Sequence, residues 1–183
     1  AMDTAKGIKA LLMTDIAHVR ANQLPPEGKV PHLAIPGTAG TGAETTAVAV
    51  LYEDGQKLSV DHPALLPDGV LLDGSLLDTL PEYHRKSCAM DALAQGIESW
   101  WAKKATPGSR IHAERAIRGV LDNLTAYLQG DRKAQDEMLH AAYESGVAIL
   151  TTRTTAAHAM SYQITKKLGA AHGLSLIHIS EPT

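Results

Sequence analysis

The feature that most constrains the fold is a change of hydrophobic pattern near Leu80-Pro81. Before this point, short apolar runs alternate with turns rich in proline and glycine, which is typical of strands and helices in an α/β layer. After it, apolar residues recur at helical spacing over long stretches, which indicates amphipathic helices. We therefore predict a partial α/β part over residues 1–80 and an all-α part over residues 81–173.

Individual elements follow from the same periodicity. Residues 2–20 carry apolar side chains on one helical face, and Pro25 and Pro26 end any continuation. Short apolar runs predict strands within residues 32–36, 47–52 and 69–73. In the second part, helices are predicted over residues 82–102, around residues 117–128, over residues 132–151 and over residues 158–168.

Composition excludes several classes of protein. The 183 residues include 17 Lys and Arg against 20 Asp and Glu, and a net charge of −3 argues against a dedicated nucleic-acid binder. No apolar run approaches the ~18 residues that a membrane span needs. The single cysteine, Cys88, excludes an intramolecular disulfide framework and favours a reducing compartment. We therefore expect a cytoplasmic protein that binds neither nucleic acid nor membrane.

A loop rich in glycine and threonine, residues 36–44, follows the first predicted strand. Its three glycines allow backbone amides to approach a ligand closely, and the hydroxyls of Thr38 and Thr41 add hydrogen-bond donors. Such a loop suits a pyrophosphate or a ribose. The alternative is a flexible connection without a ligand.

The first polar cluster lies on the helix predicted over residues 82–102. Asp91 and Gln95 are four residues apart, so their oxygens share one helix face, and Cys88 lies on the same face. A carboxylate among apolar neighbours needs a metal, an arginine or a backbone amide as its partner. The alternative is an exposed carboxylate.

Two histidines, His158 and His172, are the second candidate. One lies on a predicted helix and the other just past its end, so their rings can converge on one point. Imidazole suits Zn²⁺ or Fe²⁺, and a carboxylate completes a mixed nitrogen and oxygen ligand set. The alternative is that both are ordinary core or surface histidines.

Two further side chains lie near His158 in the sequence. Tyr162 follows it by one helical turn and could relay a proton, or could be a partly buried tyrosine with one hydrogen bond. Arg153 could grip an anionic substrate in bidentate fashion, or could be an ordinary cation at a helix end.

Taken together, and in their order along the chain, these motifs resemble those of the iron-containing (group III) alcohol dehydrogenase family. Residues 2–6 (MDTAK), with Asp3, are similar to the segment that follows the family's phosphate loop. Residues 36–44 (PGTAGTGAE) are similar to its cofactor-contacting loop, and Lys57 falls at a cofactor-contacting lysine. Residues 90–93 (MDAL) are similar to its metal-aspartate helix. The resemblance implies that the cofactor contacts are Asp3, Thr38, Ala39, Gly40, Thr41 and Lys57.

The resemblance extends to His158 and His172-Gly173, which match two metal histidines of the family. The family usually has a third metal histidine where this chain has Gln95, and often a further histidine where it has Tyr162. Glutamine offers a weak neutral oxygen, so Gln95 lowers metal affinity or changes the choice of metal. Both replacements resemble one subgroup, the phosphonoacetaldehyde reductases.

The family fold implies a dehydroquinate synthase-like architecture, with an α/β cofactor domain followed by an all-α metal domain. Compared with that fold, residues 1–173 resemble an interior fragment that is truncated at both ends and inactive on its own. Residues 174–183 (LSLIHISEPT) resemble translated adapter sequence, so we predict a non-native tail outside the fold.

The function implied by the resemblance is reduction of an aldehyde to a primary alcohol by NADH or NADPH. Fe²⁺ or Zn²⁺ on Asp91, His158 and His172, with Gln95 as a further candidate ligand, would polarise the carbonyl. Tyr162 or water would supply the proton, and Arg153 would pair with a phosphonate if the reaction converts phosphonoacetaldehyde to 2-hydroxyethylphosphonate. The alternatives are a zinc polyol dehydrogenase and a non-catalytic helical binding module. The sequence leaves open NAD against NADP, and a homo-oligomer against a monomer.

Overall fold

The computed structural model describes residues 2–25, 30–53 and 56–180, and the chain divides into two compact units. The first unit comprises Ala1–Ile35 and Ala43–Leu71, and the second comprises Pro36–Gly42 and Leu72–Thr183. The change of unit at residue 72 therefore precedes the predicted boundary at Leu80-Pro81. The difference arises because the glycine-rich loop and the segment after residue 71 pack with the helices, although their sequence looks like part of the α/β layer.

The first unit begins with two helices, α1 (Met2–Met13) and α2 (Ile16–Arg20), where the sequence predicts a single one. Asp15 interrupts the helix by adopting an extended backbone, and its carboxylate accepts a hydrogen bond from the backbone N–H of His18. Aspartate is a favoured residue at this capping position because its side chain satisfies an otherwise unpaired amide.

Strands β2 (Val48–Glu53) and β3 (Gln56–Asp61) form an antiparallel hairpin against α1. Strand β3 is absent from the predicted strands, although its apolar Leu58 and Val60 alternate with polar residues, which is a strand signal. Strands β1 (Leu33–Ala34) and β4 (Gly69–Val70) pair in parallel and are shorter than predicted. The core of this unit contains Ala10, Val19, Leu24, Ala49, Val60 and Leu65.

Lys6 connects α1 to the segment that leads into β2. Its buried Nζ donates hydrogen bonds to the carbonyl oxygens of Ala43 (2.7 Å), Thr46 (2.6 Å) and Val48 (2.9 Å). Burial lowers the pKa of Lys6 to about 8, against the opposing effect of Asp3 and Glu44. The ammonium form therefore predominates at neutral pH, and its three protons match the surrounding oxygens.

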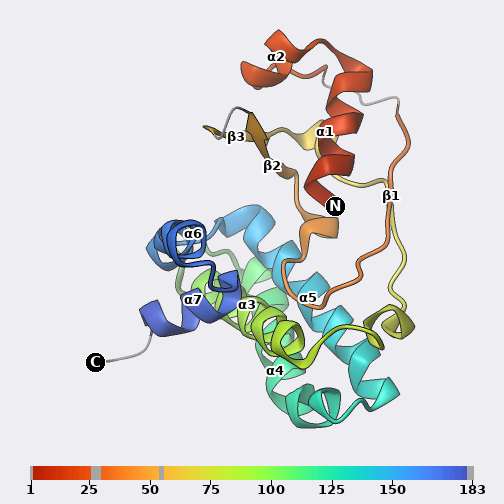
Figure 1. Ribbon diagram of the computed structural model, residues 1–183, viewed down its shortest axis with the longest axis vertical. Coiled ribbons are helices and arrows are strands. Elements are labelled where there is room, and N and C mark those ends of the chain that lie inside the picture. Colours follow the sequence, from red (N-terminus) through yellow and green to blue (C-terminus); the bar gives the residue numbers. More distant parts are fainter. Residues whose placement is uncertain (1, 26–29, 54–55, 181–183) are drawn as a thin grey trace. The chain divides into compact units, whose positions relative to one another are not determined.

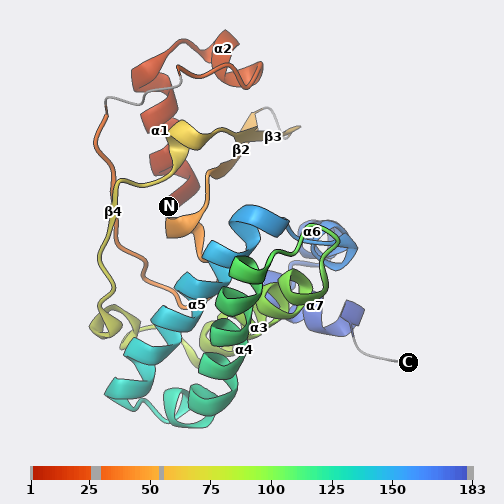
Figure 2. The same cartoon turned by 180° about the vertical axis from the view of Figure 1, so that it is seen from behind.

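The second unit is built from helices, shown in green to blue in Figures 1 and 2. Helices α3, α4 and α5 pack on one another, and α7 packs on α3 and α6. Tyr127, Met138 and Leu139 are fully buried in their core. The bounds of these helices are Glu82–Trp101 (α3), Pro107–Leu128 (α4), Arg132–Thr152 (α5), Ala156–Leu168 (α6) and His172–Ser180 (α7).

Local sequence signals set the ends of these helices. Thr106 and Ser109 form a reciprocal capping box at the start of α4, which begins ten residues before the region around residues 117–128 where the sequence predicts this helix. Asp131 caps α5 by accepting a hydrogen bond from the N–H of Ala134. Gly169 ends α6 in the left-handed conformation, with φ of 68°.

Part of the predicted non-native tail is helical, and its non-native origin stays a prediction. Residues 174–180 continue helix α7, and Leu176 is fully buried where α7 packs on α3. Residues 181–183 of the predicted tail lie outside the described residues. Among the described helices, none is long and apolar enough to cross a membrane.

The loop Pro36–Gly42 packs closely against the helices of the second unit. A Cβ on Gly40 would lie 2.9 Å from Cβ of Cys88 on α3. Gly42 has φ of 57°, and a Cβ there would lie 2.6 Å from both the carbonyl oxygen of Ala142 and Cα of Gly146 on α5. Glycine is therefore required at position 42 both by the backbone conformation and by the space.

We expect Gly42→Ala to lower the free energy of unfolding by about 2 kcal/mol or more, because it adds left-handed strain to a clash with backbone atoms. Gly37→Ala is the matched control, since nothing lies within 4 Å of a Cβ at that position. Chemical denaturation of both variants measures the difference. Equal stabilities for the two variants would contradict the packing of this loop.

Candidate metal centre

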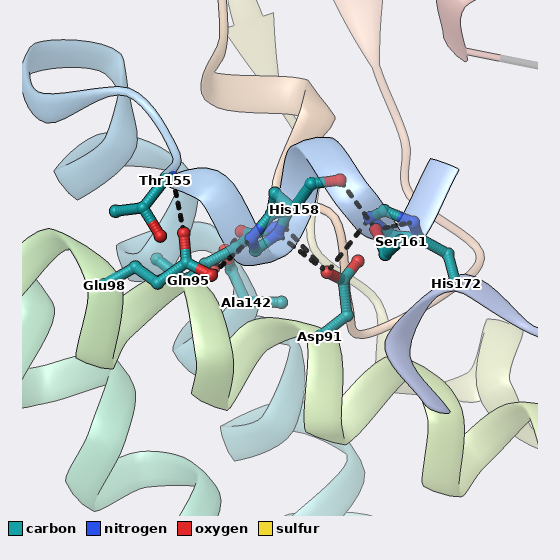
Figure 3. A network of polar contacts seen from close by, with 9 residues as sticks. Asp91, Gln95, Glu98, Ala142, Thr155, His158, Ser161 and His172 are labelled. Carbon is teal, nitrogen blue, oxygen red and sulfur yellow. Dashed lines mark hydrogen bonds and ion pairs between the residues drawn. The ribbon is translucent and has the colours of Figure 1, made fainter. Parts of the chain in front are cut away.

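Three side chains from three helices of the second unit converge in Figure 3. Asp91 lies on α3, His158 on α6 and His172 at the start of α7. Nε2 of His158 lies 3.4 Å from Oδ1 of Asp91, and Nε2 of His172 lies 3.9 Å from the same oxygen. Asp91 and His158 are 4% and 2% exposed, and His172 is half-buried. The structure thus brings together the carboxylate and the two imidazoles that the sequence singled out.

The position of the proton on His158 follows from its neighbour Glu98. Nδ1 of His158 lies 2.8 Å from Oε1 of Glu98, whose other oxygen accepts a hydrogen bond of 2.5 Å from the N–H of Thr155. An ionised carboxylate only accepts hydrogen bonds, so Nδ1 of His158 carries the proton. Nε2 is buried and forms no hydrogen bond within the described residues. In the neutral ring, its lone pair therefore faces Asp91.

His172 has the same tautomer for a different reason. The hydroxyl of Ser161 donates its single proton to the carbonyl oxygen of His158 at 2.7 Å. At 3.0 Å from Nδ1 of His172, the Ser161 oxygen must then accept the proton of that ring nitrogen. This arrangement leaves Nε2 of His172 as an acceptor directed towards Asp91.

Gln95 lies beside Asp91, one turn further along α3. Its amide nitrogen donates to Oδ1 of Asp91 at 3.3 Å, and its carbonyl oxygen accepts from the hydroxyl of Ser145 at 2.9 Å. The structure therefore brings Gln95 to the site and turns its oxygen towards α5. The metal-ligand role predicted for Gln95 remains a prediction.

Two carboxylates control the charge of His158. Burial lowers the pKa of His158, but the nearby carboxylates of Asp91 and Glu98 outweigh burial and raise it to about 9. Burial raises the pKa of Glu98, but His158 and Thr155 outweigh it and the net shift is downwards. The metal-free pocket therefore attracts positive charge at neutral pH. A divalent cation would displace the proton of His158 when it binds.

The donor atoms fit a divalent transition metal. Two imidazole nitrogens and one carboxylate oxygen, all within 4.8 Å of one another, are a set that Zn²⁺ and Fe²⁺ accept. Nε2 of His158 is buried and makes no hydrogen bond among the described residues, and the Asp91 carboxylate lies 3.4 Å from it, so a cation bound between the two atoms would satisfy both.

Tyr162 and Arg153 lie at the margins of this cluster. The Tyr162 ring stacks on His172, with centroids 4.8 Å apart, and its side chain is exposed. Arg153 ends α5 with φ of 63° and precedes the Thr155 amide that donates to Glu98. Tyr162 is therefore in contact with the site, whereas Arg153 is connected to it through the chain.

The predicted cofactor residues are divided between the two units. Asp3 lies on α1 and Lys57 on β3 in the first unit, and the side chain of Lys57 lies outside the described residues. The loop residues belong to the second unit, where Thr38 and Thr41 are exposed and Ala39 and Gly40 are buried. Their cofactor role remains a prediction.

The sequence analysis assigned no role to Glu98, Ser145 or Ser161. One signal could have found Glu98, since Asp91, Gln95 and Glu98 recur at positions i, i+4 and i+7 on one helix face. Ser161 follows His158 by three residues on α6. No spacing indicated Ser145, which comes from another helix.

Two family profiles match the chain. The profile described as "Iron-containing alcohol dehydrogenase" matches residues 1–74. The profile described as "Fe-containing alcohol dehydrogenase family, C-terminal" matches residues 86–179. Together they span both the α/β part and the helical part.

Two individual relatives match most of this chain. The chain is 32% identical to an alcohol dehydrogenase of Thermococcus barophilus, over 88% of this chain and 45% of the relative. It is 35% identical to a phosphonoacetaldehyde reductase of Streptomyces viridochromogenes, over 94% of this chain and 47% of the relative. The chain therefore spans about half the length of these relatives.

Solved structures share the fold. An iron-containing alcohol dehydrogenase from Thermococcus thioreducens matches with a TM-score of 0.87 and 30% identity, over 96% of this chain and 48% of that one. A sulfoacetaldehyde reductase from Bifidobacterium kashiwanohense in complex with NAD⁺ matches with a TM-score of 0.88 and 30% identity, with the same coverage. The resemblance inferred from the motifs is confirmed, and this chain belongs to the iron-containing alcohol dehydrogenase family.

Proposed function

We propose that this chain is part of an enzyme that interconverts an aldehyde and a primary alcohol with NAD or NADP. We propose further that Asp91, His158 and His172 hold its divalent metal. The convergence of two histidine Nε2 atoms on one buried carboxylate oxygen carries this proposal. The family membership supports the class of reaction.

The residues around the metal ligands prepare the site. Glu98 and Ser161 accept the Nδ1 protons of the two histidines, so both rings offer Nε2 without rearrangement. Burial of Asp91 and His158 excludes water from their side of the site. When bound, a divalent cation supplies Lewis acidity that polarises a carbonyl oxygen. The hydroxyl of Tyr162, whose ring stacks on His172, is the group we propose as proton donor.

The loop Pro36–Gly42 is the part of the second unit that we propose contacts the cofactor. Exposed Thr38 and Thr41 offer hydroxyl donors, while buried Ala39 and Gly40 fix the loop to the helices. A rigid backbone with exposed donors can orient a ribose or a phosphate. The NAD⁺ complex of a structural relative supports the choice of a nicotinamide cofactor.

We propose phosphonoacetaldehyde, reduced to 2-hydroxyethylphosphonate, as the substrate. A phosphonoacetaldehyde reductase is among the relatives, and a sulfoacetaldehyde reductase is among the similar structures. Both names denote an aldehyde that carries an anionic group. Arg153 is an exposed cation in a strained backbone conformation, and such strain is concentrated at functional sites. Its planar guanidinium suits a phosphonate.

We expect the purified chain to bind one Zn²⁺ or Fe²⁺ ion, and His158→Ala to lower its affinity on the order of 100-fold or more, because a ligand is lost. His140→Ala is the control, since His140 is an exposed histidine on α5. Metal analysis and calorimetric titration measure both quantities. Equal affinities in the two variants would overturn the proposed site.

In the complete enzyme that we propose, Arg153→Leu should raise KM for phosphonoacetaldehyde about tenfold or more, because a charge-assisted hydrogen bond worth roughly 1.5–3 kcal/mol is lost. KM for neutral acetaldehyde should not change. Steady-state kinetics with both substrates test this expectation. An equal change for both aldehydes would show that Arg153 does not recognise the anion.

A further inference from the structure

Glu98 is the buried carboxylate for which neither the sequence motifs nor the family comparison supplies a role. It is 3% exposed and lies on α3, two turns beyond Asp91. Each of its oxygens has its own partner from the segment around the start of α6. One oxygen faces Nδ1 of His158, and the other accepts the N–H of Thr155. A charge so deeply buried requires partners of this kind.

A capping function alone does not explain this carboxylate. Thr155 is at the capping position of α6, but its own side chain makes no capping hydrogen bond, and Glu98 accepts the backbone amide instead. A single neutral oxygen would satisfy that amide. The second oxygen is the one that holds His158, and only an acceptor in that place keeps the ring proton on Nδ1.

We propose that Glu98 is a positioning residue of the metal centre. It selects the His158 tautomer whose Nε2 is free to bind a metal, and it connects the start of α6 to α3 at the same time. This inference rests on the proposed metal site. It assigns to Glu98 an action through His158, without contact with the metal.

Glutamine at position 98 cannot perform both tasks. Its one carbonyl oxygen can accept from the Thr155 amide, which turns the NH₂ group towards Nδ1 of His158 and moves the ring proton to Nε2. In the reverse orientation, the NH₂ group faces the Thr155 N–H, which is also a donor. The first orientation caps α6 but opposes metal binding through Nε2. The second orientation keeps the proton on Nδ1 but sets two donors, the glutamine NH₂ group and the Thr155 N–H, against each other.

The test is Glu98→Gln in the 183-residue chain, with Zn²⁺ affinity measured by chelator competition. We expect a loss of roughly 10- to 100-fold, the usual cost of losing a partner that orients a metal ligand. Glu144→Gln is the matched control, because Glu144 pairs with Nδ1 of His112 on another part of the helical unit. That variant should bind Zn²⁺ like the unsubstituted chain. Unchanged affinity in a folded Glu98→Gln variant would overturn the proposal and leave Glu98 as a cap.

A second measurement does not depend on the folding of the variant. Imidazole ¹⁵N spectra of the Zn²⁺-loaded unsubstituted chain should show His158 with its proton on Nδ1 and its metal on Nε2. A spectrum with the proton on Nε2 would overturn the role of Glu98 even if the chain binds zinc. If the unsubstituted chain takes up no Zn²⁺, the proposed metal site itself is wrong and the role of Glu98 is overturned with it.

Discussion

The burial of Asp91 is the constraint on which the helical unit depends. A carboxylate that is almost inaccessible to water must be compensated by nearby donors or cations. Helix α3 contributes the amide of Gln95, and α6 and α7 each contribute a histidine. Helix α7 packs on both α3 and α6, so the contacts that assemble these helices also bring the partners of the Asp91 charge to it (Figure 3).

Hydrogen-bond acceptors beside the two histidines determine which ring nitrogen carries the proton and which can bind a metal. Glu98 and Ser161 take the Nδ1 protons by different means, one as a carboxylate and the other as a hydroxyl whose own proton is already donated. Both rings therefore offer the same nitrogen to the same place. This preorganisation is a physical argument for a metal centre that is independent of the family membership, and the two lines of argument agree.

Asp91, His158 and His172 could be chosen from the sequence as candidate metal ligands, because a carboxylate and two imidazoles are ligand types and their spacing on helices allows them to converge. The sequence also predicted the long helices, whose apolar periodicity is strong over many residues. It did not predict the contacts of Glu98 and Ser161, because their hydrogen-bond partners come together only when α3, α6 and α7 assemble. The break at Asp15 was missed because one capping residue is a weak signal within a longer apolar pattern. Strand β3 was missed because its alternation of apolar and polar residues is a weak signal.

The central claim is that one divalent metal binds Nε2 of His158, Nε2 of His172 and the Asp91 carboxylate. X-ray absorption at the zinc edge of the Zn²⁺-loaded chain measures this coordination most directly. The account predicts two imidazole ligands, with oxygen in the remaining positions and Zn–N distances of about 2.0–2.1 Å. A zinc ion with fewer than two imidazole ligands, or one bound through the Cys88 sulfur, would contradict it.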